Sequence, residues 1–222
     1  MAYVSVIAID GPVASGKTAV GRLLSQRLGY RFLDTGLMYR AVTALALRTG
    51  VDPNNEQRLT SLARSARLDV TQRDGRDRVQ ASGEDITDSL RTRDVENAVS
   101  LVSKVIGVRE ALVAQQRRMV AGGRMVMVGR DIGTVVLVDA PLKLFLKASP
   151  EVRAKRRLAE QQANGGKATF EDVLANVRLR DDLDTNRAVS PLKPASDAKI
   201  IDTDGLTLQQ VVDKALALAE RD

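Results

Sequence analysis

The chain of 222 residues contains no cysteine, no histidine and no tryptophan, and only 3% of its residues are aromatic. Without cysteine and histidine it can form no thiolate or imidazole metal site, no cysteine or histidine nucleophile and no Ser–His triad. The shortage of aromatic residues argues against a surface on which single-stranded nucleic acid would stack. Carboxylates, lysine, arginine and hydroxyl groups therefore have to carry out any chemistry.

Long apolar runs are also missing, since none approaches 18 residues, so we expect no membrane-spanning helix. Met1 is followed almost at once by an apolar strand pattern, from which we expect no signal peptide. The absence of cysteine fits a reducing compartment. Together these features predict a cytoplasmic protein. Its net charge of +6 favours anionic partners, with nucleotides, nucleic acid and anionic membranes all eligible.

The most informative motif is the segment Gly11–Thr18, which has the spacing G-x-x-x-x-G-K-[ST] of a phosphate-binding loop. It follows the apolar run 3–9 and precedes an amphipathic segment, 19–28, as this motif requires. The two glycines let the backbone aim its N–H groups inward at an anion. Lys17 adds a charge at the β- and γ-phosphates, and the Thr18 hydroxyl can ligate Mg²⁺. The sequence therefore predicts a nucleoside triphosphate site.

Apolar runs alternate with helical patterns along the chain, which is the order that builds an α/β fold with a parallel sheet covered by helices. The expected strands are residues 3–9, 30–33, 124–128, 142–147 and 199–201, and the expected helices are 37–49 and 208–221.

Two stretches depart from this alternation. Residues 68–86 contain two short strand patterns around a turn at Asp74-Gly75, which predicts an inserted antiparallel hairpin. Residues 151–168 begin with a cluster of basic residues and contain the flexible sequence Asn164-Gly165-Gly166, which is typical of a mobile lid.

A phosphate-binding loop alone does not name a reaction, because hydrolases, motors and kinases share it. The chain has no N/T-K-x-D element for reading guanine and no second long domain of the kind found in helicases or transporter ATPases. Transfer of a phosphoryl group between small molecules is the remaining expectation.

Several segments in the same order resemble the bacterial cytidylate kinases, members of the P-loop nucleoside monophosphate (NMP) kinase family. The segments are residues 11–17, 33–40, 97–100, 108–112, 129–134 and 180–192. The resemblance runs through nearly the whole chain. It implies transfer of the γ-phosphoryl group of ATP to CMP or dCMP, with Mg²⁺, giving ADP and CDP or dCDP.

The resemblance also implies a domain organisation and a set of site residues. One kinase domain, 1–222, would have a core of about 1–66, 95–150 and 188–222, an inserted NMP-binding subdomain of about 67–94, and a lid of about 151–187. The residues expected to bind ATP are Gly11, Pro12, Val13, Ala14, Ser15, Gly16, Lys17, Thr18, Ala19 and Arg156. Those expected to bind CMP are Thr35, Tyr39, Arg40, Ser100, Arg109, Arg130, Asp131, Arg180, Asp184 and Arg187. The expected catalytic residues are Lys17, Arg130, Arg153, Arg157 and Arg187, and the metal ligand is Thr18.

Residue chemistry agrees with these roles and leaves alternatives open. The Asp131 carboxylate can accept a hydrogen bond from the exocyclic amine that distinguishes cytosine from uracil. Intramolecular ion pairing is the competing interpretation for the acidic and basic residues at 130, 131, 184 and 187. Val128 stands where many relatives carry an acidic residue, so magnesium would rely on Thr18, the phosphates and water, with help from Asp34 or Asp131, or its site would be weaker.

Two other functions compete with CMP phosphorylation. A kinase of another small acceptor, such as UMP, dTMP or shikimate, would keep the phosphate-binding loop. A nucleic-acid-binding ATPase would use the basic charge instead. On the favoured interpretation the partners are ATP and CMP or dCMP alone, with no nucleic acid and no membrane, and the protein is a monomer.

Overall fold

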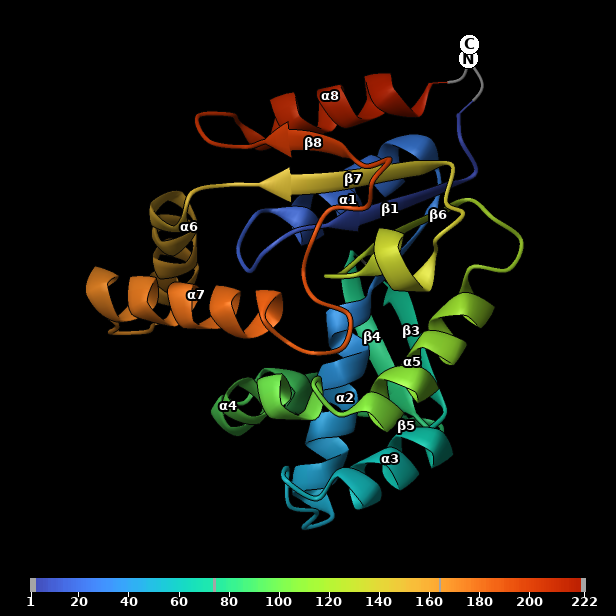
Figure 1. Cartoon of the computed structure of the whole chain (residues 1–222), viewed down its shortest axis with the longest axis vertical. Coiled ribbons are helices and arrows are strands. Elements are labelled where there is room, and N and C mark those ends of the chain that lie inside the picture. Colours follow the sequence, from blue (N-terminus) through green and yellow to red (C-terminus); the bar gives the residue numbers. More distant parts are fainter. Residues whose placement is uncertain (1–2, 74, 164, 221–222) are drawn as a thin grey trace. The chain divides into compact units, whose positions relative to one another are not determined.

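The computed structural model describes residues 3–73, 75–163 and 165–220 (Figure 1). The chain divides into two compact units, each of which is described by itself. The first, here called the P-loop unit, comprises Met1–Arg31 and Gly123–Asp222. The second, called the helix–hairpin unit, comprises Phe32–Gly122. The expected boundaries of the NMP-binding subdomain and of the lid are functional boundaries, and they stay predictions.

A five-stranded sheet has the strand order β2-β6-β1-β7-β8, and the α/β prediction is confirmed. Its strands are β1 (Val6–Asp10), β2 (Arg31–Asp34), β6 (Met125–Val128), β7 (Leu142–Lys147) and β8 (Lys199–Asp202). β1 pairs in parallel with both β6 and β7. Ile7, Ala8 and Ile9 are fully buried, as a central strand covered on both faces requires. The chain passes from one unit to the other within β2.

The helices of the P-loop unit are α1 (Lys17–Leu28), α6 (Pro150–Ala163), α7 (Phe170–Thr185) and α8 (Leu208–Ala219). A single π-helical turn, Ile132–Val136, follows β6. α1 packs against α8. α6 and α7 lie side by side (Figure 1) and share a small apolar core of Ala154, Val173 and Val177, against which Val13 of the phosphate-binding loop also packs. This core ties the predicted lid to the loop.

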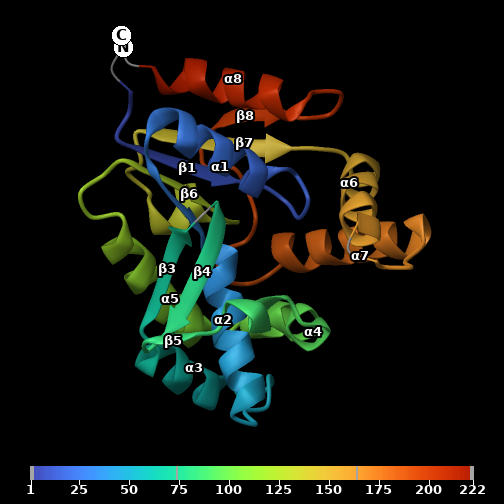
Figure 2. The ribbon, with the colours of Figure 1, turned by 180° about the vertical axis from the view of Figure 1, so that it is seen from behind.

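The helix–hairpin unit contains α2 (Thr35–Arg48), α3 (Glu56–Ser65), α4 (Arg93–Val102), α5 (Ile106–Met119) and a 3₁₀ turn (Thr87–Arg91). Its separate sheet is antiparallel and consists of β3 (Leu68–Arg73), β4 (Arg76–Ala81) and β5 (Glu84–Asp85), as Figure 2 shows from behind. The predicted hairpin is confirmed, with Leu68 opposite Ala81; Asp74 of its turn lies outside the described residues. The Gln115 side chain on α5 accepts from the Leu68 N–H (3.2 Å) and donates to the Ala66 carbonyl (2.9 Å).

Several predicted bounds differ from the observed ones. β1 begins at Val6, three residues after the predicted start, because Tyr3 instead forms an isolated bridge with Glu220. α8 ends at Ala219, and Arg221 lies outside the described residues, as does Asn164 of the predicted break after α6. The helices α3, α4, α5 and α7 had no specific prediction. In the part of the chain that the structure describes, no helix combines the length and apolar character needed to cross a bilayer.

Candidate active site

The phosphate-binding loop joins β1 to α1, and its two glycines adopt conformations that other residues rarely reach. Gly11 has φ +149°, and a Cβ there would lie 2.3 Å from the backbone oxygen of Leu146 on β7. Gly16, with φ +92°, stands immediately before α1. The close approach of β7 explains why only glycine fits at position 11. The loop backbone is thereby fixed against the sheet.

The first turn of α1 is suited to an anion. This helix begins without a side-chain cap and has no acidic residue in its first turn, so the positive end of its dipole is not neutralised by the chain itself. Lys17 is buried, and its ammonium group donates to the Pro12 carbonyl (2.6 Å) and lies 3.4 Å from the Ser15 hydroxyl. These features together form the cradle that a triphosphate needs.

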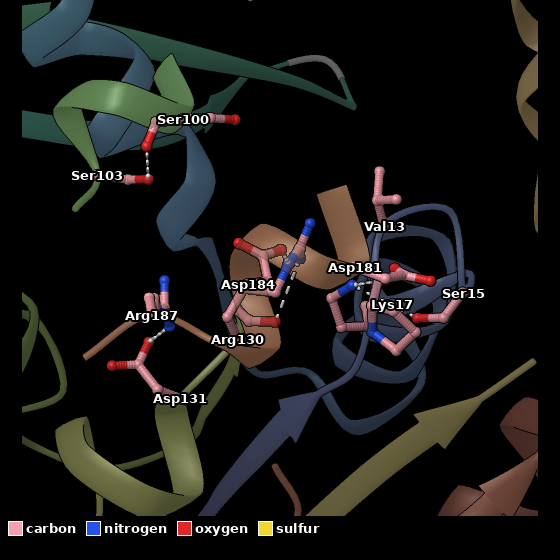
Figure 3. Close-up of polar contacts among 12 residues, drawn as sticks. Val13, Ser15, Lys17, Ser100, Ser103, Arg130, Asp131, Asp181, Asp184 and Arg187 are labelled. Atoms are coloured by element: carbon pink, nitrogen blue, oxygen red, sulfur yellow. Dashed lines mark hydrogen bonds and ion pairs between the residues drawn. The ribbon is translucent and has the colours of Figure 1, made fainter. Parts of the chain in front are cut away.

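Two guanidinium–carboxylate pairs form between residues of segments that the sequence analysis selected (Figure 3). Arg130, just after β6, donates through Nε to Asp184 on α7 at 2.9 Å. The guanidinium of Arg187 lies 3.8 Å from the Asp131 carboxylate, and both of these side chains are 6% exposed. Within the P-loop unit the structure therefore brings together residues that are more than fifty positions apart in the sequence.

Asp184 is surrounded by positive charge. Burial alone would raise the pKa of Asp184, but the charge and hydrogen bond of Arg130 outweigh this effect and hold the pKa below its ordinary value. The charges of Arg187 and Arg180 act in the same direction. One anionic group is thus stabilised by three arginines.

The three arginines on α6 make different contacts. Arg153 is buried and donates to the carbonyls of Ala148 (2.9 Å) and Val13 (3.2 Å) and, with both terminal nitrogens, to Asp181 on α7. Arg156 donates to the hydroxyl and carbonyl oxygens of Thr203, at 3.0 and 2.8 Å. Arg157 pairs with Glu160 one turn away, at 2.9 Å. Arg153 therefore joins both lid helices to the phosphate-binding loop.

The remaining predicted residues belong to the helix–hairpin unit. Thr35, Tyr39 and Arg40 lie on α2, Ser100 on α4 and Arg109 on α5. The Arg109 guanidinium carbon is 5.4 Å from the centre of the Tyr39 ring, a cation–π distance.

Backbone carbonyls accept hydrogen bonds from both predicted arginines of this unit, Arg40 and Arg109. Arg109 donates to the Ser103 carbonyl (3.1 Å), and the Ser103 hydroxyl donates to the Ser100 carbonyl (3.1 Å). Arg40 donates to the Leu90 carbonyl (3.1 Å), and its guanidinium lies 3.8 Å from Glu96. The side chains of Arg40 and Arg109, which the resemblance implicates in CMP binding, are thus anchored within their own unit.

Sequence reasoning missed Asp10, the last residue of β1. Its carboxylate is buried and accepts hydrogen bonds from the backbone N–H groups of Ile132 (2.8 Å) and Gly133 (2.7 Å). Burial raises the pKa of Asp10 to about 6, because the two N–H bonds and the Lys17 charge only partly offset the loss of solvent. A charged residue at the end of an otherwise apolar central strand is the sequence signal that could have found it.

Comparisons with known proteins show which family the chain resembles. A profile of the family "Cytidylate kinase" matches residues 7–221. The cytidylate kinase of Bacillus licheniformis is 45% identical over 216 residues, covering 97% of this chain and 96% of the relative. The cytidylate kinase of Pelotomaculum thermopropionicum is 48% identical over 212 residues, covering 95% and 94%.

Among solved structures, the shikimate kinase from Bacteroides thetaiotaomicron matches with a TM-score of 0.51 and 14% identity, covering 98% of both chains. At that identity the likeness concerns the fold alone, a P-loop kinase fold. The sequence relatives and the profile cover almost the entire chain. The resemblance predicted from the sequence is confirmed: this chain belongs to the cytidylate kinase family.

Proposed function

We propose that this chain binds ATP on the Gly11–Thr18 loop and CMP or dCMP with the residues that the sequence analysis expected, and transfers the γ-phosphoryl group without a general base. Membership of the family makes the chain an ATP-dependent kinase of these monophosphates. The residue roles below extend that activity to particular side chains. They are the roles that the sequence analysis expected.

One observation carries the proposal: Asp184 lies among Arg130, Arg180 and Arg187, and their charges hold its pKa down. A place where three guanidinium groups stabilise one anion is chemically suited to the phosphate of a nucleotide, because guanidinium forks bind phosphate oxygens. We assign the CMP phosphate to Arg130 and Arg187, and the ribose to Asp184 with Arg180. The intramolecular ion pairs then keep these side chains positioned until the substrate replaces part of the pairing.

Recognition of cytosine would come from Asp131, with Ser100 and Arg109. A carboxylate accepts from the exocyclic amine of cytosine, whereas uracil has only a carbonyl oxygen at that position. Thr35, Tyr39 and Arg40 would donate to the acceptor phosphate. A kinase of UMP or dTMP would have no use for an amine-accepting Asp131.

Catalysis would depend on positioning and electrostatics. In a loose phosphoryl-transfer transition state the acceptor oxygen needs little activation, so the lack of histidine is no obstacle. Lys17 and the α1 N-terminus would stabilise charge on the ATP phosphates, while Arg153 and Arg157 would close over them and exclude water. Arg156 would contact ATP from the same helix.

The donor set fits a weakly held Mg²⁺. Within residues 3–73, 75–163 and 165–220, no group of three acidic side chains could hold a metal ion. Thr18 would be the protein ligand, with the phosphates and water completing the shell, which is how Mg²⁺ commonly binds beside nucleotides. Asp34 already accepts from the Gly36 N–H (3.0 Å), and Val128 is buried and cannot ligate. When bound, Mg²⁺ neutralises part of the phosphate charge.

A coupled assay for ADP formation with ATP and CMP, dCMP, UMP or dTMP tests the proposal. We expect turnover with CMP and dCMP well above that with UMP or dTMP, and its loss in Lys17→Met. Equal turnover with UMP would remove Asp131 from base recognition. Retention on DNA or RNA with a steep salt dependence, without CMP-dependent ADP, would favour the nucleic-acid-binding ATPase. The monomeric state and cytoplasmic location stay predictions.

A further inference from the structure

The carboxylate of Asp10 has a role that the phosphate-binding motif does not require. Asp10 directly precedes Gly11, and it is 5% exposed at the end of the central strand β1. Each carboxylate oxygen accepts one backbone N–H: Oδ1 from Ile132 and Oδ2 from Gly133. Both acceptors therefore point at a segment that is more than 120 residues away in the sequence.

This segment is the start of the π-helical turn that follows Arg130 and Asp131. The turn has no side-chain cap of its own, since Asp131 at its N-cap position makes no capping hydrogen bond. The first N–H groups of a helical turn need external acceptors. Asp10 supplies two of them from another strand, and as a charged acceptor it makes stronger bonds than a neutral group would.

The side chain of Lys143 on β7 also lies close to this segment. A Cβ at Gly133 would lie 3.1 and 3.3 Å from the Lys143 side-chain carbons and 3.4 Å from Asp10 Oδ2. The Lys143 ammonium is itself fixed by Asp197, at 2.8 and 3.0 Å. Gly133 thus lies beside both the lysine stem and the carboxylate, and a side chain at this position would press against both.

We propose that Asp10 is a positioning residue of the phosphoryl transfer: it fixes the backbone that carries Arg130 and Asp131 to the first residue of the phosphate-binding loop. The donor loop and the acceptor-binding segment then share one rigid connection through β1. This inference rests on the proposed function, in which Arg130 and Asp131 bind CMP.

A carboxylate is suited to holding this segment because both of its oxygens accept hydrogen bonds. Asparagine has the same size but offers one carbonyl oxygen, and its amide group would meet an N–H donor. Retaining a charged group here has a cost, because Asp10 is buried and lies near the Asp131 carboxylate, while the two N–H bonds and the Lys17 ammonium offset part of that cost. The two N–H donors, one to each oxygen, explain why a residue with a single acceptor would not serve as well.

The test is Asp10→Asn, measured by calorimetric titration with CMP alone and with a non-hydrolysable ATP analogue and Mg²⁺, and by steady-state kinetics. We expect the Kd and KM for CMP to rise about tenfold, whereas those for the ATP analogue and ATP change less than about twofold. Asp213→Asn, which removes an exposed carboxylate paired with Arg27 in the same unit, is the matched control and should leave all four constants unchanged.

Unchanged CMP constants in Asp10→Asn, or ATP constants that rise as much as those for CMP, would overturn the inference. If Asp10→Asn does not fold, Gly133→Ala perturbs the same connection, because its Cβ would meet Lys143 and Asp10, and the same two criteria apply to it. A wild-type protein that turns over no CMP would contradict the proposed function. A wild-type protein that phosphorylates CMP, combined with variants that lack the selective effect, would contradict only the role of Asp10.

Discussion

The arginines among the predicted site residues are of two kinds: some lie against carboxylates, whereas others lie against neutral groups. In the P-loop unit Arg130, Arg153 and Arg187 lie against the carboxylates of Asp184, Asp181 and Asp131. In the helix–hairpin unit Arg109 lies against a carbonyl and an aromatic ring. A carboxylate partner fixes the guanidinium and offsets its charge, whereas a carbonyl or an aromatic ring fixes it without contributing a full negative charge. Arginines of the first kind must exchange partners when a phosphate binds.

The largest effect should come from an arginine of the first kind. Arg187→Ala removes a guanidinium that we place on the transferring phosphates. The transition state for CMP should lose about 2–4 kcal/mol of stabilisation, which lowers kcat/KM roughly 30- to 1000-fold. Arg27→Ala, from an exposed pair with Asp213, is the control and should change kcat/KM little. An unchanged kcat/KM in Arg187→Ala would remove this residue from the site.

Breaking a buried pair should lower stability more than breaking an exposed one. Asp181→Asn leaves the Arg153 guanidinium, whose side chain is 3% exposed, without its anionic partner. We expect the free energy of unfolding to fall by about 2–3 kcal/mol, somewhat less than for a fully buried pair because Asp181 is 26% exposed. Chemical denaturation measures this value.

Asp213→Asn is again the matched control, with an expected loss below about 0.5 kcal/mol. Equal losses in the two variants would show that burial does not distinguish the Arg153 pair from a surface pair. In that case the connection between the lid helices and the loop would rest on the apolar core around Ala154 instead.

An arginine of the second kind should affect binding rather than stability. Arg109→Met keeps the bulk of the side chain against the Tyr39 ring but removes the charge and the hydrogen bonds. CMP binding should weaken by about 2 kcal/mol, so the KM for CMP should rise roughly 30-fold while the KM for ATP stays unchanged. Arg118→Met, at an exposed position of the same helix, is the control. A parallel rise in both KM values would contradict a role in CMP binding alone.

The sequence was sufficient for features set by local pattern. β7 was predicted with its observed bounds, Leu142–Lys147, because four of its six residues are apolar, and the loop before α1 follows from its glycine spacing. Pairings between distant residues were not predictable in this way. Arg130 and Asp184 are 54 residues apart, and Asp10 and Ile132 are 122 apart. Their contacts depend on how β1, β6 and α7 pack, which no local pattern specifies.

The last comparison concerns two carboxylates of the P-loop unit, Asp10 and Asp184. The pKa of Asp10 is raised from 3.8 to about 6, whereas the pKa of Asp184 is lowered. A raised pKa means that the folded state binds the proton more tightly, so the contribution of Asp10 to stability is present below pH 3.8 and is lost as pH rises to about 6. Asp184 has the opposite sign, since its contribution is present above pH 3.8 and is lost as pH falls through its lowered pKa.

The difference between the unfolding free energies of wild type and Asp10→Asn, measured at each pH, isolates the contribution of Asp10 to stability. Going from pH 6 to pH 4, we expect wild type to gain on the order of 1–2 kcal/mol relative to the variant, because only wild type takes up a proton at this position. For Asp184→Asn, the difference in unfolding free energy from wild type should stay nearly constant between pH 6 and pH 4 and change only below this window. A flat difference for Asp10→Asn as well would show that Asp10 is not held as a buried anion, since its raised pKa arises from burial, which the two N–H bonds only partly offset.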